Sequence, residues 1–157
     1  MKQDAPTNIH ASCVVIGVQG VLIRGASGSG KSRLALKLMQ QARLQNLFFA
    51  LVSDDRTLLT RCTTKTGPRL IARPHPLTAK LLERRGTGLV RSPHLEAARL
   101  THVIDLQADH PERLPDPPDP AILIAGVRLR HVLCAFADPD PAFAALGLDL
   151  WGETVIT

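Results

Sequence analysis

The residues from 25 to 32 combine glycines with a lysine and a serine at a spacing that suits phosphate binding. They fit the pattern G-x-x-x-x-G-K-[ST] at every fixed position. Glycines let the backbone adopt positive φ and approach a phosphate closely, so that successive amide N–H groups and the start of the next helix face the anion. In this pattern the lysine reaches the β- and γ-phosphates and the hydroxyl ligates Mg²⁺. The predicted nucleotide-binding residues are Gly25, Ala26, Ser27, Gly28, Ser29, Gly30, Lys31 and Ser32.

The segments on either side of this loop are those that the pattern requires. Residues 18–24 have the composition of a short buried strand, and a helix is expected from residue 31 to residue 43 or 44. At the helical period, Leu34, Leu38 and Ala42 share one helix face. A Gly/Ser turn that only caps a helix is the alternative. The complete pattern between a strand and a helix favours a nucleoside triphosphate site instead.

A second candidate feature is the pair Asp54–Asp55, which ends an apolar run over residues 47–53. Such a run predicts a buried strand, and α/β enzymes that bind nucleotides place functional groups at the carboxyl ends of their strands. Mg²⁺ prefers oxygen ligands, and a carboxylate can accept a proton from a hydroxyl group. An aspartate pair also commonly opens a turn. Its position one strand–helix–strand unit after the glycine loop favours a functional role.

The remaining elements predict one α/β domain over residues 1–157, with many short strands. Residues 1–8 are expected to form a flexible arm, and the proline-rich residues 110–120 a surface loop. A hairpin turn is predicted at 17–20. Further strands are expected over 9–16, 57–62, 69–72, 100–106, 121–125 and 127–136, and short helices over 77–82 and 142–146.

Composition narrows the class of protein. The chain has 157 residues, of which 45% are hydrophobic, so it should form a globular core. No apolar run approaches the roughly 18 residues of a membrane span, and residues 1–7 lack a signal-peptide core, so a cytoplasmic location is expected. The net charge of +5 suits nucleotide phosphate and an acidic partner. With only 3% aromatic residues, no stacking platform for single-stranded nucleic acid is expected.

Four segments, in this order, resemble the C-terminal catalytic domain of HPr kinase/phosphorylase, in the short form found in some proteobacteria. The resemblance covers roughly residues 9–106. The glycine loop alone is shared by many families, whereas the ordered set is much more specific. The segments resemble the family's histidine-bearing strand (Ile9–Ser12), its strand and phosphate loop (Gly20–Ser32), its double-aspartate strand end (Leu51–Asp55) and its E-x-R-G-x-G signature (Leu82–Val90).

This resemblance implies a fold and an activity. The fold would be a P-loop domain related to phosphoenolpyruvate carboxykinase, with a mixed, strand-rich sheet. The activity would be transfer of the γ-phosphoryl group of ATP, with Mg²⁺, to a serine of HPr or an HPr-like phosphocarrier of the phosphotransferase system. Some members also run phosphorolysis. The family resemblance further implies a homo-oligomer, typically a hexamer, and a regulatory phosphorelay in carbohydrate or nitrogen metabolism.

The resemblance also implies residue roles. Lys31 would neutralise phosphate charge, which phosphoryl transfer needs more than covalent chemistry. Ser32 and Asp55 would ligate Mg²⁺, and Asp54 would accept the proton of the incoming serine hydroxyl. His10 would orient or tune the aspartates.

Two further roles come from the signature segment. Glu83 matches the family's glutamate near the metal or the nucleotide, and Arg85 matches the arginine that would stabilise transferring charge. Without the resemblance, a residue such as Glu83 is more often a helix-end carboxylate, and one such as Arg85 is more often a solvated basic side chain. The same holds for His10, which on a strand is commonly structural.

Two other functions remain open from the sequence. A small-molecule kinase or general ATPase could use the same glycine loop, although it has no stated reason to carry the signature at residues 83–88. A nucleotide-sensing interaction protein with little catalysis is the third possibility. It would bind ATP tightly and hold a partner without transferring phosphate.

Overall fold

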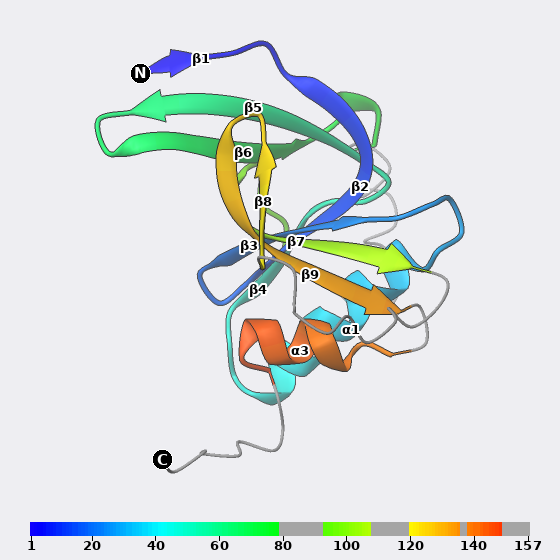
Figure 1. Ribbon diagram of the computed structural model, residues 1–157. Coiled ribbons are helices and arrows are strands. Elements are labelled where there is room, and N and C mark those ends of the chain that lie inside the picture. The colour runs from blue at the N-terminus through cyan, green and yellow to red at the C-terminus, as the bar shows by residue number, and fades with distance from the viewer. Residues whose placement is uncertain (79–92, 108–119, 136–137, 149–157) are drawn as a thin grey trace, which may run out of the picture.

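The computed structural model describes residues 1–78, 93–107, 120–135 and 138–148. Figure 1 shows helices α1 and α3 on one side of strands β3, β7 and β9, with the β5–β6 hairpin on the other side. The strands are β1 (Lys2–Gln3), β2 (Thr7–Ile16), β3 (Gln19–Arg24), β4 (Phe49–Ser53), β5 (Arg56–Thr64), β6 (Gly67–Pro74), β7 (Ala98–Gln107), β8 (Ala121–Ile124) and β9 (Val127–Ala135), and the helices are α1 (Lys31–Leu44) and α3 (Asp140–Leu146).

Two long strands connect the halves of the sheet. The first part of β2 pairs with β5, and its second part pairs with β3 and β4. Likewise β7 begins against β6 and then runs parallel to both β3 and β9. Because β5 also pairs with β6, the strands β2, β3, β7, β6 and β5 form a closed ring. The expectation of a strand-rich α/β fold with a mixed sheet is therefore confirmed.

The alternation of side chains along these strands creates two hydrophobic cores. Successive residues of a strand point to opposite faces, so one set packs against the helices and the other fills the ring. The helix-side core includes Val14, Ile23 and Ile104 with Leu34, Leu38 and Ala42 of α1. The core inside the ring includes Ala11, Cys13, Leu22, Leu70, Ala72, Val103 and Leu129.

Helix α1 ends where the sequence predicted, and its apolar face is the predicted one. Leu34, Leu38 and Ala42 are all buried against the sheet. The strand predicted for residues 47–53 instead begins at Phe49. The amide of Leu47 still donates to the carbonyl of Ala42 at 2.9 Å, so this part of the apolar run belongs to the end of the helix.

The predicted flexible arm over residues 1–8 is wrong. Lys2 pairs with Thr63 and Gln3 pairs with Cys62, so β1 lies on the edge of β5. Thr7 already belongs to β2, which also pairs with β5. The polar composition of this segment gives no sign of a strand, because its stability comes from pairing with a partner distant in sequence.

Parts of the remaining predictions lie outside the described residues. This applies to most of the predicted helix at 77–82 and of the proline-rich loop at 110–120. The predicted strands at 100–106, 121–125 and 127–136 are confirmed as β7, β8 and β9, and the short helix at 142–146 is confirmed as α3. Within the described residues, no helix is long and apolar enough to cross a membrane.

Candidate active site

The glycine loop connects β3 to α1 and depends on its glycines for its shape. Gly28 and Gly30 have φ values of 76° and 94°, in the left-handed region that side-chain-bearing residues rarely adopt. The amide of Ser29 donates to the carbonyl of Ala26 at 3.0 Å, which closes a tight turn. At Gly25 a Cβ atom would lie 2.5 Å from the Ser29 hydroxyl, so a side chain there would need Ser29 to move.

The start of α1 faces the loop without a side-chain cap. Gly30 is the N-cap residue and makes no side-chain capping hydrogen bond, and the first turn contains no acidic residue. The first amides of a helix have no partner within the helix, and they carry the positive end of its dipole. This helix end is therefore suited to an external anion.

Lys31 is almost fully buried, with 6% of its surface exposed. Its ammonium group donates to the carbonyl oxygens of Gly25 and Ala26, each at 3.0 Å. A buried charge needs such partners, because its removal from water is otherwise very unfavourable. The positive charge is thus held against the loop backbone by two neutral acceptors.

Asp54 follows β4 and contacts residues of two other elements, α1 and β2. Its Oδ1 atom accepts a hydrogen bond of 2.6 Å from Ser32 of α1 and one of 2.9 Å from Ser12 of β2. Asp54 itself directly follows β4. The result is a compact set of hydroxyl and carboxylate oxygens, which is the ligand chemistry that Mg²⁺ prefers.

Asp55 points to a different partner. Its Oδ1 atom lies 3.2 Å from Nε2 of His10, and both side chains are solvent-accessible, at 62% and 48%. The backbone of Asp55 has a φ of 72°, and the amide of Arg56 donates to the carbonyl of Asp54 at 2.9 Å. Positive φ is uncommon for a residue with a side chain, although aspartate tolerates it better than most. This tight reversal lets adjacent carboxylates contact separate partners.

A cleft of about 410 Å³ brings these groups together. The cleft thus unites the predicted histidine, most of the glycine loop and Asp55, whereas Asp54 lies beside it in contact with Ser32, which pairs with Asp54 instead of Asp55. The cleft is lined by His10, Ser27, Gly28, Gly30, Lys31, Ser32, Arg33 and Asp55.

Sequence reasoning missed Ser12 and Arg33. Ser12 lies two positions after His10, and in a strand such residues share a face, so the period of the strand could have identified it. Glu83 and Arg85 lie outside the described residues, and their predicted roles stay predictions. Among the described residues, no group of three or more His, Cys, Asp or Glu side chains could hold a metal ion.

A second polar cluster, which we call the Asp105 cluster, consists of Arg24, Asp105 and His131. Asp105 accepts hydrogen bonds from Nε and Nη2 of Arg24 at 2.8 and 2.7 Å, and its Oδ2 atom lies 2.7 Å from Nε2 of His131. Burial acts to raise the pKa of Asp105, but the hydrogen bonds from Arg24 and His131 hold it below its usual value. Because Arg24 directly precedes Gly25, the cluster fixes the strand from which the loop departs.

Comparisons with known proteins identify the family. Residues 2–101 match the family model described as the HPr Serine kinase C-terminal domain. The chain is 40% identical over 80 residues to the HPr kinase/phosphorylase of Mycoplasma mycoides, covering 51% of this chain and 22% of that protein. It is 41% identical over 91 residues to the HPr kinase/phosphorylase of Bordetella pertussis, covering 57% and 26% respectively.

A third relative and a solved structure extend the match. The HPr kinase/phosphorylase of Geobacillus thermodenitrificans is 35% identical over 117 residues, covering 69% of this chain and 35% of that protein. The Hpr(Ser) kinase/phosphatase from Coxiella burnetii matches with a TM-score of 0.57 and 21% identity, covering 90% of this chain and 93% of that chain. The chain spans between about a fifth and a third of the length of these curated relatives.

The fold is therefore the mixed, strand-rich α/β fold of an HPr kinase. The family model covers well over half of the residues. The chain belongs to the HPr serine kinase C-terminal domain family.

Proposed function

We propose that this chain is the catalytic domain of an ATP-dependent protein-serine kinase that phosphorylates HPr or an HPr-like phosphocarrier in a regulatory phosphorelay. The observation that carries the proposal is the single cleft in which the glycine loop faces His10 and Asp55, beside the Ser32–Asp54 contact. Family membership supports a protein acceptor, and the names of the relatives include a phosphorylase activity. Phosphorolysis of the seryl phosphate, in which inorganic phosphate accepts the phosphoryl group and pyrophosphate and the free serine hydroxyl are released, is accordingly a second activity that we include.

Nucleotide binding would use the loop of the P-loop type. The amides of the loop and the uncapped start of α1 would surround the phosphates of ATP. Among the described residues Lys31 donates to two neutral carbonyl oxygens, so an oxygen of an anionic phosphate would be a stronger acceptor for its ammonium group. The same side chain would then neutralise charge on the transferred group.

The donor set beside the loop fits Mg²⁺. The Ser32 hydroxyl and the Asp54 carboxylate are oxygen ligands in direct contact, and Ser12 orients the carboxylate through a second hydrogen bond to the same Oδ1 atom. When bound, the ion would neutralise phosphate charge during transfer. Glu83 remains a proposed additional ligand.

Asp55 is then left to accept the proton of the substrate serine. It has a single ion-pair partner among the described residues, His10, and it lines the open cleft. His10 would orient this carboxylate, and Arg85 would stabilise the transferring charge. This assignment reverses the sequence-based expectation, in which Asp54 was the base and Asp55 the metal ligand. The reason is the Ser32–Asp54 hydrogen bond of 2.6 Å.

A transfer assay tests the proposal. The purified chain, γ-labelled ATP and Mg²⁺ are mixed with HPr-like carriers of the host, and the labelled residue is identified by mass spectrometry. We expect label on a carrier serine, reduced at least about 100-fold in Lys31→Ala. ATP turnover that needs no protein acceptor would indicate a small-molecule kinase or ATPase. Tight ATP binding with no transfer to any carrier would indicate a nucleotide sensor.

The division of labour between the aspartates has its own test. In Asp55→Asn we expect a fall in kcat of about 10²–10⁴ that added Mg²⁺ does not restore. In Asp54→Asn we expect a higher Mg²⁺ requirement, with partial recovery at high Mg²⁺ concentration. Asp4→Asn removes the same charge outside the cleft and serves as the control. The reverse pattern would restore the original assignment.

We also propose that the domain functions as a homo-oligomer, and the family resemblance gives a hexamer as the expected size. Light scattering coupled to size-exclusion chromatography measures the mass directly. A monomeric mass at the protein concentration of the transfer assay would contradict this part of the proposal.

A further inference from the structure

Three arginines surround one isoleucine on the outer face of the ring. Residues Leu70 and Ala72 of β6 point into the ring core, so the alternate positions Arg69, Ile71 and Arg73 point outward. The ladder between β6 and β7 sets Arg99 opposite Ile71. Arg99 is thus the direct neighbour of the isoleucine and the diagonal neighbour of the other two arginines.

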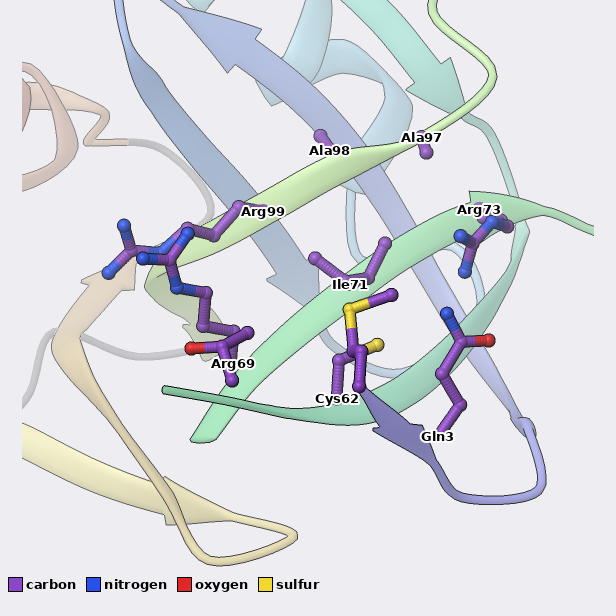
Figure 2. Close-up of a pocket in the computed structure, with 10 residues that line it drawn as sticks. Gln3, Cys62, Arg69, Ile71, Arg73, Ala97, Ala98 and Arg99 are labelled. Carbon is purple, nitrogen blue, oxygen red and sulfur yellow. The ribbon is translucent and has the colours of Figure 1, made fainter. Parts of the chain in front are cut away.

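These residues form a hollow of about 310 Å³, which we call the outer-face hollow. Figure 2 shows Arg69 and Arg73 at opposite ends of it, with Ile71 between them. Arg69 and Arg99 also line a neighbouring hollow, so both can be reached from two sides. The other labelled lining residues are mainly small or apolar: Cys62, Ala97 and Ala98, with Gln3.

The positive charge of this hollow is not balanced within the described part of the chain. None of the ion pairs there involves Arg69, Arg73 or Arg99. Glu96, which lies close to Arg99 along the chain, takes part in none of these ion pairs either. Like charges at cross-strand neighbour distances repel one another, so an anion from outside would be stabilised here.

The hollow is also built rigidly. Arg69 donates to the hydroxyl of Thr66 at 2.9 Å, which fixes its guanidinium against the β5–β6 turn. The backbone of Arg99 lies so close to Gly20 that a Cβ atom there would be 2.0 Å from the Arg99 carbonyl oxygen. A preorganised group loses less conformational freedom on binding, which favours affinity.

We propose that the outer-face hollow binds an extended acidic segment of a protein partner. This segment would carry one apolar side chain with one carboxylate side chain on each side of it. In an extended segment every second side chain lies on the same face, at the spacing of Arg69, Ile71 and Arg73. A small polyanion would pair with the arginines but leave the apolar floor uncovered.

This surface is separate from the cleft and goes beyond the proposed function. Arg99 lies at the start of β7, whereas the glycine loop follows the end of the parallel strand β3. A partner in the hollow would therefore leave the cleft open. Its docking would recruit or position the kinase domain without contacting the reacting groups.

The probe is a synthetic peptide, Glu-Thr-Leu-Thr-Glu, blocked at both ends and titrated into the ¹⁵N-labelled chain. We expect shifts of the β6 and β7 amides and a measurable Kd. The neutral peptide Gln-Thr-Leu-Thr-Gln should bind at least about tenfold more weakly, because charge-assisted hydrogen bonds are lost. The peptide Glu-Thr-Gly-Thr-Glu, which lacks the apolar side chain, should also bind more weakly.

Variants of the protein locate the site. Arg99→Gln and Arg73→Gln should each weaken peptide binding by about tenfold, and Arg99→Lys should lose less because it keeps the charge. Arg43→Gln, on the exposed face of α1, makes the same change in net charge and should leave binding unaltered. Thermal unfolding establishes that each variant is folded.

Three results would overturn the proposal. The first is equal affinity for the acidic and the neutral peptide. The second is an Arg99→Gln variant, folded by its unfolding curve, that binds as the wild type does. The third is displacement of the peptide by inorganic pyrophosphate at matched concentration, which would assign the hollow to a small phosphorylated ligand. None of these outcomes depends on whether the cleft transfers phosphate.

Discussion

Asp54, beside the cleft, and Asp105, in the Asp105 cluster, differ in the kind of hydrogen-bond partner that holds each carboxylate. Asp105 accepts hydrogen bonds from two nitrogen atoms of Arg24, Nε and Nη2, and also lies within hydrogen-bond distance of His131. Its side chain is 24% exposed. Asp54 accepts hydrogen bonds only from the neutral hydroxyls of Ser12 and Ser32 among the described residues. Both lie near the carboxyl ends of strands, so position alone does not separate them.

The difference shows which carboxylate is available for chemistry. The charge of Asp105 is neutralised within the fold, and its bonds join β3, β7 and β9. Asp54 is oriented by its partners but keeps a negative charge that no side-chain cation in the described residues balances. A carboxylate with hydroxyl partners can therefore attract a cation, whereas one with a bidentate arginine serves the fold.

The strongest test of this contrast is Asp54→Asn. We expect phosphoryl transfer at standard Mg²⁺ to fall at least about 100-fold, because the charge that attracts the cation is removed. The free energy of unfolding should change by less than about 1 kcal/mol, since only hydrogen bonds to neutral hydroxyls are affected. Urea denaturation beside the transfer assay measures both. A large loss of stability with activity retained would contradict the view that Asp54 serves chemistry and not the fold.

Asp105→Asn should give the opposite result. Removing the charge leaves Arg24 without its partner in a partly buried site, and we expect a loss of about 2 kcal/mol in the free energy of unfolding. The value is below that of a fully buried pair because the side chains are partly exposed. At a temperature well below the midpoint of unfolding, transfer activity should stay within a few-fold of wild type. Unchanged urea midpoints would contradict the structural role.

Ser12→Ala should have a smaller effect, which is on the Mg²⁺ dependence of phosphoryl transfer. It removes one of the two hydroxyls that orient Asp54 without changing any charge. Partners of this kind typically contribute tenfold or more to metal affinity, so the Mg²⁺ concentration for half-maximal transfer should rise roughly tenfold. Thr60→Ser, a mild change at another buried hydroxyl, is the control. An unaltered Mg²⁺ dependence would show that Ser12 serves packing only.

The smallest of these expected effects is the contribution of the Asp105 cluster to the pH dependence of the free energy of unfolding. The pKa of Asp105 is lower in the folded protein, so its contribution is present above the unfolded value near pH 4 and is lost as pH falls through the folded value. The difference in urea midpoint between wild type and Asp105→Asn should therefore shrink as the pH is lowered below about 4. A difference that grows with acidity would have the wrong sign.

The sequence predicted those parts of the site that lie close together along the chain. The glycine spacing fixed the loop and the start of α1, and the apolar run located Asp54 and Asp55 at the end of β4. These features depend on local backbone geometry and on short-range periodicity. The same reasoning identified the buried face of α1.

The sequence did not predict what depends on strand pairing. Nothing in the local pattern shows that Arg24 and Asp105, which are 81 positions apart, come into contact. The contact of Ser32 with Asp54 in place of Asp55 results from a turn with positive φ at Asp55, which composition does not reveal. The pairing of β1 and the first residues of β2 with β5 is likewise a tertiary effect.

The parallel pairing of β3 with β7 has a consequence for how the protein reaches its native state. Gly20 pairs with Leu100, and Arg24 pairs with Asp105. The pairing of β3 with β7 therefore cannot form until β7, which is synthesised much later, is present. Bringing such distant segments together loses loop-closure entropy before any contact compensates it, and non-local pairing of this kind slows folding. We therefore expect the glycine loop to acquire its final shape in a late step, after the β5–β6 hairpin has formed.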